Sequence, residues 1–190
     1  MRTERELLVD CLERLNRVGV PYMLVGSMAS NYWGIPRSTH DLDFVLALQL
    51  ADADLFAAAF RTGFFVQAES IRSAFSPPHQ FNAMDEQSAL KVDFWLLKQD
   101  AFERNAFERR RPVSLFGTPA WIMTAEDVIL HKFYRHTISP SDRQLLDATG
   151  VYAVQEGSLD QVYLRRWAPM LGVEAELAAL RSGQLKPKSS

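Results

Sequence analysis

The stretch LVGSMASNYWGIPRSTHDLDFV, residues 24–45, decides the fold. An apolar run stops at Gly26-Ser27, a short amphipathic segment follows, and an apolar strand then carries Asp41 and Asp43. Because side chains alternate between the faces of a strand, the two aspartates share one face and the apolar residues share the other. Two adjacent carboxylates repel each other and are costly to desolvate. A cation between them removes that cost, and oxygen ligands of this kind suit Mg²⁺ or Mn²⁺.

A second apolar strand repeats this arrangement. In ALKVDFWLL, residues 89–97, Asp93 lies between two apolar residues, and Lys91 falls on the same face as Asp93. If the two strands are neighbours, the carboxylates of Asp41, Asp43 and Asp93 converge. Three such carboxylates are the ligand set of a two-metal site that clamps an in-line displacement at phosphorus.

Two features near the acids favour phosphate binding. Gly26-Ser27, at a strand-to-helix junction, leaves backbone N–H groups and a hydroxyl at the positive end of a helix. Arg37 just precedes the acids, and its planar fork of donors suits phosphate oxygens. Each has an ordinary alternative, because Ser27 can be a simple helix N-cap and Arg37 a surface turn residue. The aspartates can likewise be the solvent-exposed face of a half-buried strand.

Composition sets the broad class. The chain has 190 residues, of which 47% are hydrophobic, and a net charge of −2, which gives no basic signature for nucleic acid outside a local patch. Cys11 is the only cysteine, so a disulfide framework and a Cys-based metal site are excluded. The first residues carry no apolar signal-peptide core, and no apolar run is long enough for a membrane span. We therefore expect a cytoplasmic protein with no membrane partner.

The pattern of elements predicts two parts and a tail. Residues 1–123 alternate between helical and strand patterns, residues 124–184 are helical throughout, and the polar segment 185–190 is expected to fray. Helices are expected up to 18, from a Thr3–Glu6 capping box, and at 27–33, 52–62, 99–110, 125–136, 140–154, 159–170 and 174–181. Strands are expected at 21–25, 40–46, 64–67, 80–83, 90–97, 113–116 and 121–123. The core is expected to include Phe56, Phe60, Phe64 and Phe65.

These residues resemble the nucleotidyltransferase fold of the DNA polymerase beta-like superfamily. Its signature is an apolar residue with Gly-Ser, then D-h-D, then a later h-D-h, where h is apolar. This sequence carries it as Val25-Gly26-Ser27, Asp41-Leu42-Asp43 and Val92-Asp93-Phe94. The stretch also resembles small bacterial nucleotidyltransferases with an R-x-T-x-D-h-D-h pattern, a set that includes toxins of abortive-infection type toxin–antitoxin pairs. Its gap between Gly-Ser and the acids is longer than in the shortest family members.

The C-terminal stretch resembles the same set, where one helix carries a lysine and the next carries paired acids. In TAEDVILHKFYRH and SDRQLLDATGVY these positions are Lys132, and Asp142 with Asp147. Taken from the residues alone, Lys132 is as well explained as a solvated charge. The resemblance implies that Lys132 neutralises the leaving pyrophosphate.

The resemblance implies a fold, a reaction and a set of site residues. The fold is α/β (α+β), a mixed sheet with flanking helices plus a helical C-terminal part. The reaction moves a nucleoside monophosphate from an NTP to an acceptor hydroxyl, and an antitoxin is a further partner. The resemblance does not imply the acceptor, because the superfamily modifies RNA ends, proteins and small molecules. We expect RNA or protein, with a small antibiotic as a variant. The implied catalytic and metal-binding residues are Asp41, Asp43 and Asp93, which hold Mg²⁺ or Mn²⁺. The implied nucleotide-binding residues are Gly26, Ser27, Arg37 and Lys132.

Two other functions stay open at this point. One is a non-catalytic nucleotide-binding or interaction module on the same fold, against which the presence of all three acids argues. The other is a metal-dependent phosphohydrolase built from the same acids. The Gly-Ser junction argues against it, because that junction suggests binding of a triphosphate.

Overall fold

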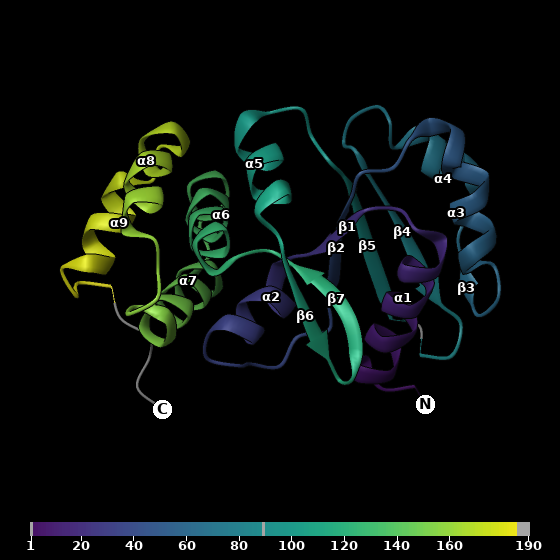
Figure 1. Ribbon diagram of the computed structural model, residues 1–190, viewed down its shortest axis with the longest axis horizontal. Coiled ribbons are helices and arrows are strands. Elements are labelled where there is room, and N and C mark those ends of the chain that lie inside the picture. The colour runs from purple at the N-terminus through teal and green to yellow at the C-terminus, as the bar shows by residue number, and fades with distance from the viewer. Residues whose placement is uncertain (1, 89, 186–190) are drawn as a thin grey trace. The chain divides into compact units, whose positions relative to one another are not determined.

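The computed structural model describes residues 2–88 and 90–185 and divides into two compact units (Figure 1). The first unit runs up to Gly26 and from Thr39 to Ile122, and the second comprises Ser27–Ser38 and the chain from Met123 onward. The sequence placed the boundary after residue 123 and gave residues 27–38 to the first part, whereas here they belong to the second unit. Of the expected tail, residues 186–190 lie outside the described residues.

Within the described residues, seven strands of the first unit form one mixed sheet in the order β3-β4-β5-β2-β1-β7-β6. The pairs β2–β5 and β1–β7 are parallel, and the other neighbouring pairs are antiparallel. This confirms the predicted α/β class. The strands are β1 Tyr22–Leu24, β2 Leu42–Leu46, β3 Phe64–Phe65, β4 Gln80–Asp85, β5 Lys91–Leu96, β6 Arg111–Leu115 and β7 Thr118–Ile122.

Aromatic side chains fill the core on one face of the sheet. Phe94, on β5, contacts Phe56 and Phe60 of helix α3 (Ala53–Phe60), Phe81 of β4 and Phe44 of β2, with ring centroids 5.2–5.8 Å apart. Aromatic pairs at this spacing add to the free energy gained by burial. The same alternation that points these rings into the core points the residues between them to the opposite face.

One predicted core residue is exposed. Phe65 has 62% of its surface accessible, whereas its neighbour Phe64 is buried, because successive residues of β3 face opposite sides of the sheet. The prediction of Phe65 as a core residue was therefore wrong. The short helix α4 (Ala68–Ser73) follows β3 and was not predicted, and the first unit also contains the 3-10 turn η1 (Leu50–Asp52) and α5 (Ala101–Arg109).

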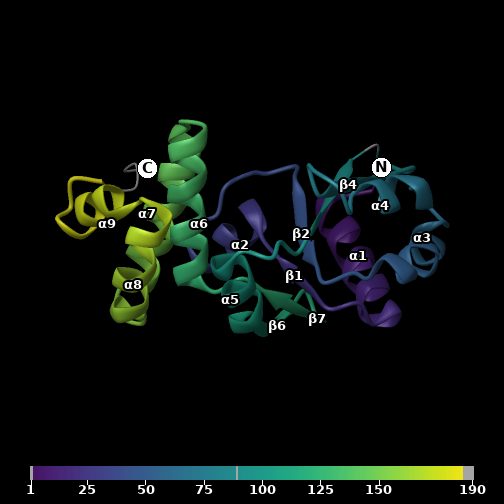
Figure 2. The same ribbon diagram turned by 90° about the horizontal axis from the view of Figure 1, so that it is seen from above.

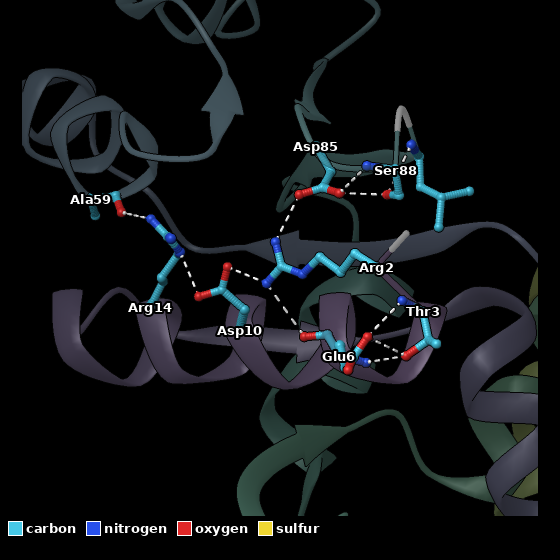
Figure 3. Close-up of polar contacts among 9 residues, drawn as sticks. Arg2, Thr3, Glu6, Asp10, Arg14, Ala59, Asp85 and Ser88 are labelled. Carbon is cyan, nitrogen blue, oxygen red and sulfur yellow. Dashed lines mark hydrogen bonds and ion pairs between the residues drawn. The ribbon is translucent and has the colours of Figure 1, made fainter.

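Helix α1 (Glu4–Val18) begins with the predicted capping box. The Thr3 hydroxyl accepts a hydrogen bond from the Glu6 backbone N–H at 3.2 Å, and the Glu6 carboxylate accepts one from the Thr3 N–H at 2.8 Å (Figure 3). The helix ends at Gly19, which adopts a left-handed conformation with φ of 76°. Both ends of α1 are thus set by local sequence signals.

A polar network ties α1 to the sheet (Figure 3). The Arg2 guanidinium donates to the buried carboxylate of Asp85, the last residue of β4, at 2.7 Å and also pairs with Asp10 on α1. Arg14 donates to Asp10 at 2.8 Å and to the Ala59 carbonyl at 2.8 Å. Burial would raise the pKa values of Asp10 and Asp85, but the hydrogen bonds they accept hold both pKa values below the ordinary value.

The second unit is helical (Figure 2). Its helices are α2 (Gly26–Trp33, whose first residue belongs to the first unit), α6 (Ala125–Ile138), α7 (Asp142–Gln155), α8 (Gln161–Leu171) and α9 (Glu174–Arg181). The Trp33 indole N–H donates to the Met123 carbonyl at 2.7 Å, and the Gln155 amide donates to the Trp33 carbonyl at 2.8 Å. Gly34 packs so tightly that a Cβ there would lie 2.6 Å from the Val151 nitrogen.

Among the described residues, the helices are too short or too polar for any of them to cross a membrane.

Candidate functional site

Two aspartates lie side by side on neighbouring parallel strands. Asp43 of β2 and Asp93 of β5 are register partners, and the flanking pairs Leu42–Val92 and Phe44–Phe94 face the core. Partners in register point to the same face of a sheet. The two acid-bearing strands are therefore neighbours, which is the condition under which the carboxylates were predicted to converge. Asp41 lies one residue before Leu42, the first residue of β2 that pairs with β5.

The ammonium of Lys91 lies among these carboxylates. Lys91 Nζ is 2.9 Å from Asp93 Oδ2, as its position two residues earlier on β5 predicts. The hydrogen bond with Asp93 raises the pKa of Lys91, and the negative charges of Asp93, Asp41 and Asp43 raise it further. The negative field of all three acids is therefore felt at one point on the sheet face.

The other oxygen of Asp93 is buried without a partner. Only 8% of Asp93 is accessible, and none of the described residues donates a hydrogen bond to its Oδ1. A buried carboxylate oxygen in this condition is costly, and an oxygen-liganded cation would satisfy it. In residues 2–88 and 90–185, no group of three or more His, Cys, Asp or Glu side chains has the spacing of a metal site. The metal-ligand role of Asp41, Asp43 and Asp93 stays a prediction.

The glycine before α2 is required by its contact with Asp43. Gly26 has φ of +65°, and a Cβ at this position would lie 2.4 Å from Asp43 Oδ2. The turn is held against β2 because the Val25 N–H donates to the Asp43 carbonyl at 3.0 Å. Trp95, two residues after Asp93, donates from its indole N–H to Asp43 Oδ1 at 3.4 Å. Only glycine allows this close approach to the carboxylate.

The second unit holds a separate charged cluster centred on Asp147 of α7. Arg37 binds its carboxylate through two nitrogens, Nε at 2.7 Å and Nη2 at 2.9 Å, and Lys132 Nζ lies 2.7 Å from Oδ2. Arg37 Nη2 also donates to the Ser27 hydroxyl at 2.9 Å, and the Ser30 hydroxyl donates to Asp147 Oδ2 at 3.3 Å. Two of the predicted nucleotide-binding residues, Arg37 and Lys132, thus share one carboxylate, and a third, Ser27, is joined to it through Arg37.

The centre of this cluster is buried, and its single carboxylate, Asp147, binds two cations, Arg37 and Lys132. Lys132 is 6% accessible and Asp147 is 7% accessible, so the solvated-charge interpretation of Lys132 does not apply. Burial would raise the pKa of Asp147, but the hydrogen bonds from Arg37 and the charge of Lys132 hold it below its ordinary value. Sequence reasoning noted Asp147 only as part of an acid pattern. No local signal in the sequence identified its pairing with Arg37 and Lys132.

Ser27 is not the N-cap of α2, because the helix already begins at Gly26 and Ser27 lies in its first turn. Its hydroxyl instead accepts the hydrogen bond from Arg37. The backbone of Arg37 is fixed in turn by Asn31, whose side-chain amide donates to the Arg37 carbonyl at 2.7 Å and whose side-chain oxygen accepts from the Arg37 N–H at 3.0 Å. Among the predicted nucleotide-binding residues, Gly26 alone lies in the unit that carries the acids.

The sheet and its flanking helices define the nucleotidyltransferase fold. The chain is similar to the antibiotic-resistance factor ANT(2'')-Ia in solution, with a TM-score of 0.60 and 14% identity over 95% of this chain and 96% of that one. It is similar to ANT(2'')-Ia in complex with adenylyl-2''-tobramycin, with a TM-score of 0.56 and 15% identity over 96% and 99%. It is also similar to an antigenic nucleotidyltransferase-like protein from Paracoccidioides brasiliensis, with a TM-score of 0.56 and 13% identity over 98% and 95%. No family model and no curated protein matches the chain.

Proposed function

We propose that this protein is a nucleotidyltransferase that moves a nucleoside monophosphate from an NTP to an acceptor hydroxyl. The observation that carries the proposal is the register pairing of Asp43 with Asp93 on the nucleotidyltransferase fold. A fold alone does not determine an activity, and these side chains supply the chemistry that the fold does not specify. The solved structure of ANT(2'')-Ia with adenylyl-2''-tobramycin is consistent with nucleotidyl transfer on this fold.

Asp41, Asp43 and Asp93 would hold divalent cations, Mg²⁺ or Mn²⁺. The buried and unpartnered Oδ1 of Asp93 supports this, as does a donor set made of carboxylate oxygens, which these cations prefer. When bound, such ions neutralise the charge that develops on the phosphoryl oxygens and lower the pKa of the attacking hydroxyl.

Asp93 is proposed as the proton acceptor in this reaction. The acceptor oxygen forms a bond to the α-phosphorus, the bond from that phosphorus to the pyrophosphate oxygen breaks, and Asp93 takes the hydroxyl proton. Gly26 lets its own backbone lie against the Asp43 carboxylate, because it has no side chain there, and its backbone N–H is proposed to bind the phosphates. Ser27, Arg37 and Lys132 are proposed to bind phosphate oxygens and to stabilise the leaving pyrophosphate.

The sequence resemblance adds a biological setting. It suggests a toxin–antitoxin role with an antitoxin partner, and RNA or a protein is the acceptor expected with that role. These remain predictions that depend on the resemblance alone.

A transfer assay tests the proposed function. Purified protein with Mg²⁺ is given each α-labelled NTP in turn, with total RNA, total protein and small polyhydroxylated molecules as acceptors. The expected result is transfer of label from at least one NTP, which is lost in the Asp41→Ala/Asp43→Ala double variant. Asp54→Asn is the matched control, because Asp54 is an exposed acid of the same unit whose ion-pair partner among the described residues is the surface residue Arg72. Absence of Mg²⁺-dependent NTP binding by calorimetry would overturn the proposal.

A further inference from the structure

A hollow of about 410 Å³ lies along β4, the strand next to the acid-bearing strand β5, within the first unit. It is bounded by β4, by the segment that follows β3, and by α4. Its polar lining consists largely of amides and hydroxyls, from Gln67, Ser70, Ser73, Gln80 and Asn82. Its volume falls in the range of pockets that bind small molecules, which is about 300–1,000 Å³.

The hollow exists because β3 is only two residues long. Phe64 and Phe65 pair with Asp85 and Met84, so the register between β3 and β4 ends before Asn82. The chain then leaves the sheet and enters α4. The outer edge of β4 near Asn82 therefore borders the hollow instead of a neighbouring strand.

Asn82 connects the hollow to the acids. It lies opposite Asp93 in the antiparallel pairing of β4 with β5, and Asp93 lies opposite Asp43. Register partners point to the same face, with Cβ atoms about 4.5–5.5 Å apart. Asn82, Asp93 and Asp43 thus form one row across three adjacent strands. A molecule that contacts Asn82 from the hollow is within reach of the proposed proton acceptor.

The charges of the side chains that line the hollow indicate which class of acceptor it can bind. Among the described residues that line it there is no lysine or arginine, and the single charged side chain is the acid Glu69. Nucleic acid is bound chiefly through basic contacts to its phosphates, and this lining offers none. Amides and hydroxyls instead form hydrogen bonds with the hydroxyls or amines of a polar small molecule, while the exposed ring of Phe65 provides an apolar surface.

We propose that this hollow is the acceptor site and that the acceptor is a small polyhydroxylated molecule, uncharged or cationic. The Asn82 amide orients one hydroxyl of this molecule toward Asp93, the group that takes its proton. This inference rests on the proposed transfer reaction and names its substrate class. It differs from the acceptor expected from the sequence, which was RNA or protein, and favours the small-molecule variant.

The test fills the hollow without touching the acids. Ser70→Trp places a large ring in the hollow from the exposed side of α4, and Ser114→Trp is the matched control, an exposed serine on β6 at the other edge of the sheet. The probes are tobramycin as a cationic acceptor, maltotriose as an uncharged acceptor, and a short RNA oligonucleotide as an anionic acceptor. Transfer from labelled NTP, Mg²⁺-dependent NTP binding and calorimetric binding of each probe are measured on the full chain.

The expected result is transfer to tobramycin or maltotriose, with a KM raised at least about tenfold in Ser70→Trp. NTP binding should be unchanged in that variant, and Ser114→Trp should resemble the parent protein. Transfer to RNA or protein alone would overturn the acceptor assignment while supporting the proposed function. Unchanged KM in Ser70→Trp, or no binding of tobramycin and maltotriose to the parent protein, would also overturn it. Failure of the proposed function itself has a different readout: the parent protein would not bind NTP in the presence of Mg²⁺.

Discussion

Lys91 Nζ lies 2.9 Å from Asp93 Oδ2, so a cation of the chain itself neutralises one oxygen of the central carboxylate. The other oxygen, Oδ1, is buried and accepts no hydrogen bond from the described residues. Only one of the two oxygens of Asp93 therefore has a partner. An added cation would be attracted less strongly than to a free carboxylate, because the positive charge of Lys91 already offsets part of the negative charge. Lys91 is expected to position Asp93 and to set how strongly divalent ions bind.

Replacement of Lys91 by methionine tests this role. Lys91→Met removes the ion pair and leaves the Asp93 carboxylate buried, so we expect the free energy of unfolding in the absence of divalent ions to fall by about 1 kcal/mol. Added Mg²⁺ should then raise the melting temperature more in Lys91→Met than in the parent protein. Lys91→Arg keeps the charge and is the control. Equal responses to Mg²⁺ in all three proteins would contradict the assignment.

Gly26→Ala should disturb Asp43 in a way that another glycine substitution does not. Gly26 and Gly63 both have positive φ, +65° and +85°, but a Cβ at Gly63 would meet nothing within 4 Å. Gly63→Ala therefore carries only the backbone strain, about 1–2 kcal/mol, and Gly26→Ala adds the clash with Asp43 Oδ2. We expect Gly26→Ala to be the less stable of the two in urea unfolding and to bind Mg²⁺ and NTP more weakly. Equal losses would show that the contact with Asp43 carries no cost.

Asp147→Asn should strongly destabilise the second unit. It leaves the buried ammonium of Lys132 and the Arg37 guanidinium without their counter-charge, and breaking a buried pair costs about 3–5 kcal/mol. Asp142→Asn, an exposed acid at the start of the same helix, is the control and should change stability by less than about 0.5 kcal/mol. A loss below about 1 kcal/mol in Asp147→Asn would mean that the cluster contributes little.

The same residue predicts a dependence on pH. The pKa of Asp147 is lowered in the folded protein, so its contribution is complete above the unfolded value of about 4. It is lost as pH falls from that value through the lowered pKa. In urea unfolding from pH 6 to pH 2, the free energy of unfolding should fall less with decreasing pH in Asp147→Asn than in the parent protein. Asp10 and Asp85 also have lowered pKa values, so they cause a loss of stability at low pH that is the same in both proteins.

Phe94→Ala and Phe65→Ala should separate the core face from the open face of the sheet. Phe94 is completely buried at the centre of the aromatic cluster, and its loss should cost about 3–5 kcal/mol. Phe65 is exposed, and its loss should change stability by less than about 0.5 kcal/mol. Chemical denaturation measures both values. A large loss in Phe65→Ala would contradict its exposed position.

Local signals predicted most of the elements. The capping box at Thr3 and the glycine at position 19 set both ends of α1, and strand alternation put Asp43 and Phe44 on opposite faces. The same alternation, applied to β3, would have placed Phe65 outside the core. Helix α4 was missed because six residues carry less than two turns of periodicity.

Long-range features could not be read from the sequence. Asp43 and Asp93 are register partners although they lie 50 positions apart in the sequence. Alternation predicts which face of the sheet a residue is on, but it does not predict which residue of the next strand it pairs with. The pairing of Arg37 and Lys132 with Asp147 likewise depends on how α6 and α7 pack. Motif resemblance named most of the residues involved, but it carried no information on which charges neutralise one another.

The inclusion of residues 27–38 in the second unit has a consequence for the order of synthesis. Trp33 binds Met123 and Gln155, which follow it by 90 and 122 positions, and Arg37 binds Asp147 after 110. At about 5–20 residues per second, a ribosome completes these partners roughly 5–25 s after the segment itself. During that interval the rest of the first unit is synthesised, while the segment 27–38 still lacks its partners in the later part of the second unit. A chain that ended at residue 123 would keep the segment permanently in that unfinished state.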